Sequence, residues 1–151
     1  MFDDTDLAIL EILQHNARTP NADIARRVGM AASATLERVR KLEERGAILG
    51  YEARLDSAAL ELGLIAFLFV RTTDRPGHLE TARRIAQVPE VQEVHHIAGE
   101  DCYLVKLRAR DPADLGRLIR DHIGPIGSIT STRTTIVLET VKESGTMPLP
   151  K

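Results

Sequence analysis

The sequence predicts an α+β protein, with three short helices in an N-terminal domain and alternating strands and helices in a C-terminal domain. The first observation behind this prediction is segment 24–46, where an apolar helix ends at Gly29 and an amphipathic helix follows. The second is a change of rhythm after residue 63, where apolar runs of strand length alternate with segments of helical periodicity. At 151 residues the chain is long enough for two small domains.

The pattern of the first 46 residues predicts three short helices. The helices are expected to begin after Asp3 or Asp4, at the N-cap and first-turn pair Thr19-Pro20, and around Ala32. They are expected to end near His15, at Arg27 before the Gly29 turn, and at Arg45 before Gly46.

The third helix combines an apolar stripe with a polar face. Leu36, Val39 and Leu42 recur every third residue and are expected to form the buried side. The residues expected to face outward are Ser33, Ala34, Glu37, Arg38 and Lys41. Such a helix after a turn is typical of a helix-turn-helix, whose second helix enters the major groove of double-stranded DNA. The alternative is a solvated helix stabilised by pairs such as Glu37 with Lys41.

The outward side chains of the third helix are candidates for contacts with DNA. Ser33, at the start of the helix, is one of these candidates. Arg38 matches guanine O6 and N7, and Glu37 can accept a hydrogen bond from cytosine N4. Lys41 and Arg45 are better suited to phosphates. Segment 24–45 carries six basic and three acidic residues although the whole chain has a net charge of −2, so attraction to phosphate would be confined to one face.

The second half of the chain alternates between strands and helices. The expected strands are 64–72, 91–98, 102–109 and 129–141, and the expected helices are 78–87 and 112–122, the latter beginning with Asp111-Pro112. This βαββαβ order is that of the ferredoxin-like motif. The predicted domains are therefore a helix-turn-helix, winged-helix-like domain at 1–46 and a ferredoxin-like domain at 64–142, joined by a connecting strand within 47–63 and followed by a tail at 143–151.

A tight turn at Gly99-Glu100-Asp101 joins two of the expected strands and presents two carboxylates. The last strand alternates strictly and places Thr130, Thr132 and Thr134 on one face. Carboxylates can bind an ammonium group and hydroxyls can bind a carboxylate, so the turn and the threonines together suit an amino-acid ligand. An ordinary hairpin turn is the alternative, since glycine and aspartate are common turn residues.

Other features limit the classes of function. Cys102 is the only cysteine, which rules out an intramolecular disulfide and a cysteine-rich zinc site and fits a reducing compartment. His95 and His96 are adjacent on a strand and cannot chelate one metal together. No catalytic triad or glycine-rich phosphate loop is recognisable, so no enzyme activity, cofactor or metal is expected. The acidic N-terminus and the shortness of the apolar run 62–70 argue against a signal peptide and a membrane span, and predict a cytoplasmic protein.

The strand expected at Leu64–Thr72 also bears on assembly, because it is apolar at successive positions up to Val70. Such a strand cannot keep one of its faces in water. One face is therefore expected to meet helices and the other a partner subunit, which predicts a homodimer.

The chain resembles the Lrp/AsnC (feast/famine) family of bacterial and archaeal transcription regulators. The resemblance covers nearly the whole chain and rests on five segments in the family's order: FDDTDLAILEILQ, ADIARRVGM, TLERVRKLEERGAILGYEARLD, AGEDCYLVKLRA and STRTTIVLETVKE. It implies a helix-turn-helix, a ferredoxin-like RAM domain that pairs into dimers and often octamers, and an amino-acid effector near residues 99–101, between neighbouring dimers. Relatives usually have serine at the positions of Pro20 and Ala31; Thr19 can replace the first cap, whereas the third helix lacks an obvious cap unless it begins at Ser33.

The principal hypothesis is a homo-oligomeric, sequence-specific DNA-binding regulator controlled by a small effector, expected to be an amino acid. One alternative is an effector-blind architectural DNA-binding protein that acts through oligomerisation. Another is a small ligand-binding enzyme on a ferredoxin-like fold, whose helical domain makes protein contacts. The exposed charges expected at Arg38 and Lys41 favour DNA binding over the enzyme.

Overall fold

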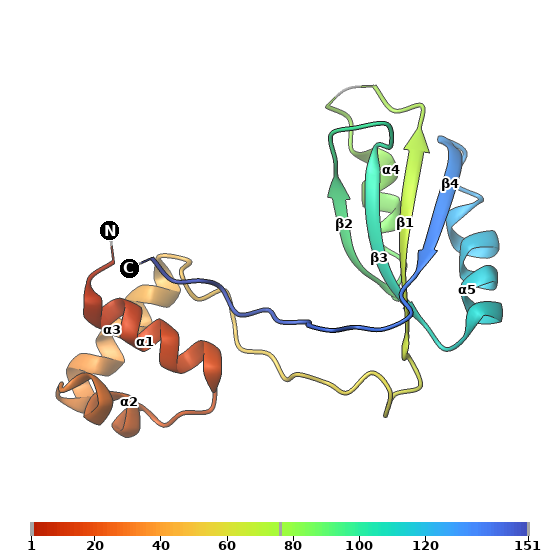
Figure 1. Cartoon of the computed structure of the whole chain (residues 1–151). Coiled ribbons are helices and arrows are strands. Elements are labelled where there is room, and N and C mark those ends of the chain that lie inside the picture. Colours follow the sequence, from red (N-terminus) through yellow and green to blue (C-terminus); the bar gives the residue numbers. More distant parts are fainter. Residues whose placement is uncertain (1, 76, 151) are drawn as a thin grey trace. The chain divides into compact units, whose positions relative to one another are not determined.

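The computed structural model describes residues 2–75 and 77–150. They form two compact units, which are considered separately (Figure 1). Unit 1 comprises the residues up to Arg54 and those from Lys142 onward, whereas unit 2 comprises Leu55–Val141. The chain therefore returns, after unit 2, to the unit in which it began.

Unit 1 contains three helices, namely α1 (Asp4–His15), α2 (Asn21–Val28) and α3 (Ala32–Glu44). The expected cap of α1 is confirmed, because the Asp3 carboxylate accepts a hydrogen bond of 2.8 Å from the Asp6 N–H. Gly29 makes the turn between α2 and α3 at φ 68°, a left-handed conformation that glycine adopts without steric cost. The buried core of the three helices consists of Ile9, Leu13, Ile24 and Leu42.

Two expectations for this half of the chain are wrong. Thr19 does not cap α2: its hydroxyl donates to the Asn16 carbonyl at 2.8 Å, and Pro20 occupies the N-cap position without a side-chain bond. No strand occurs between α3 and Leu64, where all residues are described. The chain after α3 instead folds back on the helix, since the Ile48 N–H bonds to the Leu42 carbonyl at 3.2 Å.

Unit 2 is an antiparallel sheet of four strands in the order β2-β3-β1-β4. The strands are β1 (Leu64–Thr72), β2 (Val91–His96), β3 (Tyr103–Ala109) and β4 (Ile129–Ile136). Helix α4 (Glu80–Ile85) connects β1 to β2, and α5 (Pro112–Leu118), continued by a π-helical turn at Ile119–Ile123, connects β3 to β4. This topology confirms the α+β class and the ferredoxin-like βαββαβ order.

Both helices of unit 2 cover the same face of the sheet (Figure 1). Alternate residues of β1 and β3, such as Leu68 and Val105, are fully buried against Ile85 of α4 and Leu118 of α5. The intervening residues point to the opposite face, where Phe67 and other apolar side chains remain partly exposed. The sheet therefore has one covered face and one open face.

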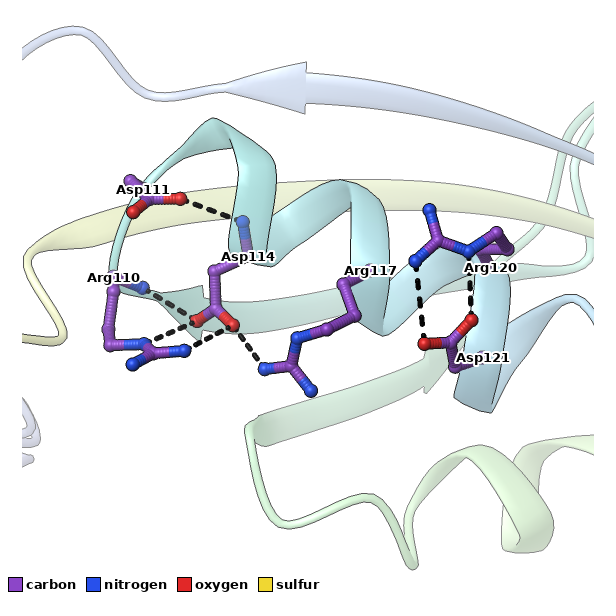
Figure 2. A network of polar contacts seen from close by, with 6 residues as sticks. All are labelled: Arg110, Asp111, Asp114, Arg117, Arg120 and Asp121. Carbon is purple, nitrogen blue, oxygen red and sulfur yellow. Dashed lines mark hydrogen bonds and ion pairs between the residues drawn. The ribbon is translucent and has the colours of Figure 1, made fainter.

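The start of α5 is fixed by polar contacts (Figure 2). The Asp111 carboxylate caps the helix by accepting from the Asp114 N–H at 2.7 Å, as expected. The nearly buried Asp114 carboxylate in turn bonds to Arg110 at 3.1 Å and to Arg117. Hydrogen bonds hold the pKa of Asp114 well below its ordinary value of 3.8, and the largest contribution comes from the Arg110 guanidinium.

The segment from Lys142 onward belongs to unit 1 and contacts α1. The Gln14 side-chain amide donates to the Met147 carbonyl at 3.2 Å and accepts from the Met147 N–H at 3.0 Å. One glutamine thus satisfies both backbone groups of a residue in the tail.

Candidate nucleic-acid interface and effector site

Helix α3 buries a different stripe from the one expected. Thr35 and Leu42 are 0% and 1% exposed, and Val39 is partly buried, whereas Leu36 is 59% exposed. The Thr35 hydroxyl donates to the Ala31 carbonyl at 3.1 Å, so this polar side chain can be buried with its hydrogen bond made. The expectation that Leu36 lies in the core is therefore wrong, and Leu36 instead joins the outward face.

Arg38 lies between α3 and the start of α1. One of its guanidinium nitrogens is 2.7 Å from Asp3 Oδ2 and 2.7 Å from Asp6 Oδ1, and its side chain is 32% exposed. Hydrogen bonds to the carboxylates of Asp3 and, to a smaller extent, Asp6 raise the pKa of Arg38. The pKa of Asp3 is lowered mainly by the hydrogen bond from the Asp6 N–H and next by the hydrogen bond from Arg38. Arg38 therefore ties α3 to α1, and the expected fully outward position for it is wrong.

The outward face of α3 carries a row of ion pairs. Glu37 Oε1 lies 3.3 Å from Arg40 Nη2 and 3.8 Å from Lys41 Nζ, and Arg40 also lies 3.4 Å from Glu44. Ser33 is exposed at the N-terminal end of the same helix. The helical pairing anticipated as the alternative is thus present, but such exposed pairs are weak enough to open when a phosphate or base competes.

Lys41 and Arg45 line one hollow with Asp6, Arg38 and Leu42, of about 260 Å³. The Arg45 guanidinium carbon also lies 4.8 Å from the centroid of the Phe2 ring. Asp6 offsets the charge of Arg38 there, so the positive charge of this hollow comes from Lys41 and Arg45 at the C-terminal end of α3. This is the part of the helix that the sequence assigns to phosphate contacts.

The N-terminus of α3 has no side-chain cap. The helix begins at Ala32, so the alternative of a late start at Ser33 is wrong, and Ala31 occupies the N-cap position in extended conformation at φ −66° and ψ 144°. Asn21 of α2 donates its side-chain amide to the Ala32 carbonyl at 2.7 Å. This bond holds the starts of α2 and α3 together without satisfying the free N–H groups of α3.

In unit 2, Asp101 is held between two arginines. Its carboxylate, whose side chain is 14% exposed, lies 3.2 Å from Arg71 Nε and 3.1 Å from Arg133 Nη2. Glu100 is more exposed and lies 3.2 Å from Arg71 Nη2. Gly99 has φ 142°, in the positive range that favours glycine. The turn expected from the sequence therefore belongs to a cluster of two carboxylates and two guanidinium groups.

The threonines of β4 do not join this cluster. Thr132 and Thr134 pair with Val70 and Leu68, whose side chains are buried on the covered face, and paired residues of a sheet share a face. Thr130 lies where the register of β1 with β4 shifts. Arg133 pairs instead with Phe69 on the open face, and its guanidinium carbon lies 4.0 Å from the Phe69 ring centroid.

Sequence reasoning missed Arg71 and Arg133 as partners of Asp101. The alternation that places the threonines together also places Arg133 on the opposite face of β4. Arg71 continues the Phe67 and Phe69 face at the end of β1. The two arginines could therefore have been assigned to the open face, but only the register between β1 and β4 brings them to one carboxylate.

A helix-turn-helix unit followed by a separate α+β unit with a charged cluster is the construction of a DNA-binding transcription regulator with a ligand-binding domain. Residues 2–43 match the AsnC-type helix-turn-helix domain, and residues 65–147 match the Lrp/AsnC ligand binding domain. The chain belongs to the Lrp/AsnC family of transcriptional regulators.

Similar proteins extend over almost the whole chain. The transcriptional regulator FL11 of Pyrococcus horikoshii is 35% identical over 147 residues, covering 97% of this chain and 96% of FL11. The crystal structure of a Neisseria meningitidis regulator in complex with L-methionine has a TM-score of 0.92 at 28% identity, covering 98% and 97% of the two chains. A feast or famine regulatory protein of Mycobacterium tuberculosis, also complexed with L-methionine, has a TM-score of 0.89 at 29% identity, covering 97% of this chain and 99% of that one.

None of the helices within residues 2–75 and 77–150 combines the length and the apolar character needed to cross a bilayer.

Proposed function

We propose that this regulator binds an amino acid at the cluster of Arg71, Asp101 and Arg133, and that the bound amino acid changes its affinity for DNA. The observation that carries the proposal is the Asp101 carboxylate held between two guanidinium groups at the surface of unit 2. The two similar structures that contain L-methionine support an amino acid as the class of effector.

The cluster offers both charges that an amino acid needs. Guanidinium groups bind a carboxylate through paired, charge-assisted hydrogen bonds, so Arg71 and Arg133 suit the carboxylate of the ligand. Asp101 and the exposed Glu100 suit its ammonium group. This assignment replaces the expected contact between the carboxylate and Thr132 or Thr134, because those threonines share a face with the buried side chains of β1.

Isothermal titration with each of the twenty amino acids tests the proposal. Wild-type protein should bind one or a few of them, and Asp101→Ala should abolish binding while leaving the DNA affinity of the unliganded protein unchanged. Asp121→Ala is the control, because Asp121 is likewise an aspartate paired with an arginine, Arg120 at 2.9 Å, but lies on the π-helical turn. Equal binding by wild type and Asp101→Ala would place the ligand elsewhere.

The same titration separates the alternatives. If wild-type protein binds none of the amino acids but still binds DNA, it is the effector-blind architectural protein. If an effector binds, typical allosteric coupling of about 1–3 kcal/mol predicts that it changes the DNA affinity by roughly 5- to 150-fold. Measuring the affinity for DNA with and without the amino acid gives this factor directly.

The DNA-binding surface proposed here is the outward face of α3. Ser33 and Glu37 lie on this face toward base edges, and Lys41 and Arg45 supply phosphate contacts from the positively charged hollow. Arg38 is proposed to act mainly by fixing α3 against Asp3 and Asp6 rather than by reading guanine. The partner is double-stranded DNA, and the proposed location is the cytoplasm, where a DNA-binding regulator of this class works.

The open face of the sheet is proposed as the surface that joins two copies in a homodimer. Phe67 and Phe69 of β1 pair with Lys106 and Leu104 of β3, so an apolar centre lies between charged residues on this face. Among the described residues of unit 2, no further helix or strand is left to cover this face. Assembly of such dimers into an octamer would follow the pattern that the family resemblance implies.

A further inference from the structure

We propose that Leu36 determines part of the operator sequence by contacting the C5-methyl group of a thymine in the major groove. The proposal rests on the proposed function, since it requires α3 to enter the groove of double-stranded DNA. It goes further by naming one residue and the one chemical group that this residue recognises.

Leu36 is an exception among the three helices of unit 1. In α1, α2 and α3, all of whose residues are described, the other large apolar side chains are buried or partly buried, whereas Leu36 is 59% exposed. It lies beside the stripe formed by Thr35, Val39 and Leu42, about a quarter turn around α3 from the centre of that stripe. Among the described residues of unit 1, Leu36 therefore keeps more than half of its surface in water.

The neighbours of Leu36 on α3 identify the surface on which it lies. Ser33 and Arg40 are three residues before and four residues after it, which places all three side chains on adjacent turns of one helical face. Arg40 and Glu37 are already paired to each other at 3.3 Å. An exposed aliphatic side chain thus sits within the polar row that the proposed function turns toward DNA.

Only one group in the major groove matches an aliphatic side chain. Guanine, adenine and cytosine present hydrogen-bond donors and acceptors there, whereas thymine adds an apolar methyl group. Burial of a methyl group against Leu36 removes apolar surface of both partners from water, and the free energy of burying one such group corresponds to about a fourfold change in Kd. Leu36 therefore selects for thymine without any hydrogen bond.

The experiment uses full-length protein and DNA that the protein itself selects. Duplexes are enriched from a random library, and each thymine of the preferred sequence is then replaced singly by deoxyuridine, which keeps base pairing and removes only the methyl group. Kd is measured by fluorescence anisotropy for wild type, Leu36→Ala and the control Leu60→Ala. Leu60 suits as a control because it is 53% exposed and lies in unit 2.

For wild type and Leu60→Ala, one deoxyuridine position in each half-site should raise Kd about fourfold. For Leu36→Ala, the same replacement should have no effect, and the thermal unfolding temperature of this variant should equal that of wild type because Leu36 is exposed. Insensitivity of wild type to every replacement, or a sensitivity that survives in Leu36→Ala, overturns the proposal. A change of oligomeric mass in Leu36→Ala with unchanged sensitivity to deoxyuridine also overturns it, since Leu36 would then contact protein. Failure to enrich any sequence instead overturns the proposed sequence-specific DNA binding itself.

Discussion

The missing cap of α3 makes Ala31→Ser a stabilising substitution. Ala31 already has the extended conformation of an N-cap residue, at φ −66° and ψ 144°, but has no side chain that can accept a hydrogen bond. A serine oxygen at this position can accept from the N–H of Ser33 or Ala34, which have no partner within the helix. A serine in place of alanine at an N-cap contributes about 1 kcal/mol, with a range of roughly 0.5–2 kcal/mol.

The size of unit 1 converts this free energy into a measurable shift. For a unit of about 60 residues, a change of 1 kcal/mol moves the melting temperature by roughly 4–8 °C. Urea denaturation followed by helical circular dichroism should show a higher midpoint with an unchanged m-value. Ala32→Ser is the matched control, because the first helical position cannot cap and serine there should be neutral or slightly destabilising. An unchanged midpoint for Ala31→Ser, or an equal gain from Ala32→Ser, would refute the reasoning.

Three further substitutions test other parts of the structure. Lys41→Ala should weaken binding to all duplexes alike and reduce the slope of log K against log salt by about one, as anisotropy at several salt concentrations would show; a loss confined to one sequence contradicts a phosphate contact. Phe67→Asp places a carboxylate at the apolar centre of the open sheet face and should give the mass of a single chain by light scattering, whereas an unchanged mass excludes this face as the dimer surface. Because the pKa of Asp114 is lowered, its contribution to stability is complete above its ordinary pKa of 3.8 and is lost as the pH falls below it. The difference in urea midpoint between wild type and Asp114→Asn should therefore be constant from pH 7 to pH 5 and shrink only below about pH 3.8; a difference that shrinks near pH 6 would point to another group.

Local patterns in the sequence were sufficient to predict most of the fold. The strand Leu64–Thr72 has the expected bounds because a continuous apolar run of that length has few other structures available. Asp3 and Asp111 cap their helices as expected, since a cap depends on residues only three positions apart. The connecting strand expected within 47–63 failed because a strand also needs a partner, and the residues around Ile48 bond to α3 instead.

The candidate sites were less predictable because they depend on contacts between distant segments. The phase of α3 was assigned from Leu36, Val39 and Leu42, whereas the helix buries Thr35, a polar residue whose hydroxyl donates to the carbonyl of the N-cap residue Ala31. Arg38 was expected to face outward, since no periodicity in α3 reveals that Asp3 and Asp6 lie beside it. In unit 2 the sequence predicted the Gly99-Glu100-Asp101 turn. It did not predict the partners of Asp101, Arg71 and Arg133, because these are brought together by the register between β1 and β4.

The bonds between Gln14 and Met147 set an order of events during synthesis of the chain. These residues are 133 positions apart, so at translation rates of roughly 5–20 residues per second the contact cannot form until on the order of 10 s after Gln14 has been made. By then the ribosome has translated all of unit 2, which lies between them. The three helices can pack around their own core as they emerge, but α1 acquires its last partner only after the sheet has been made. The unit that the ribosome begins first is therefore completed last, and Gln14 of a nascent chain lacks the backbone partner that it has in the finished protein.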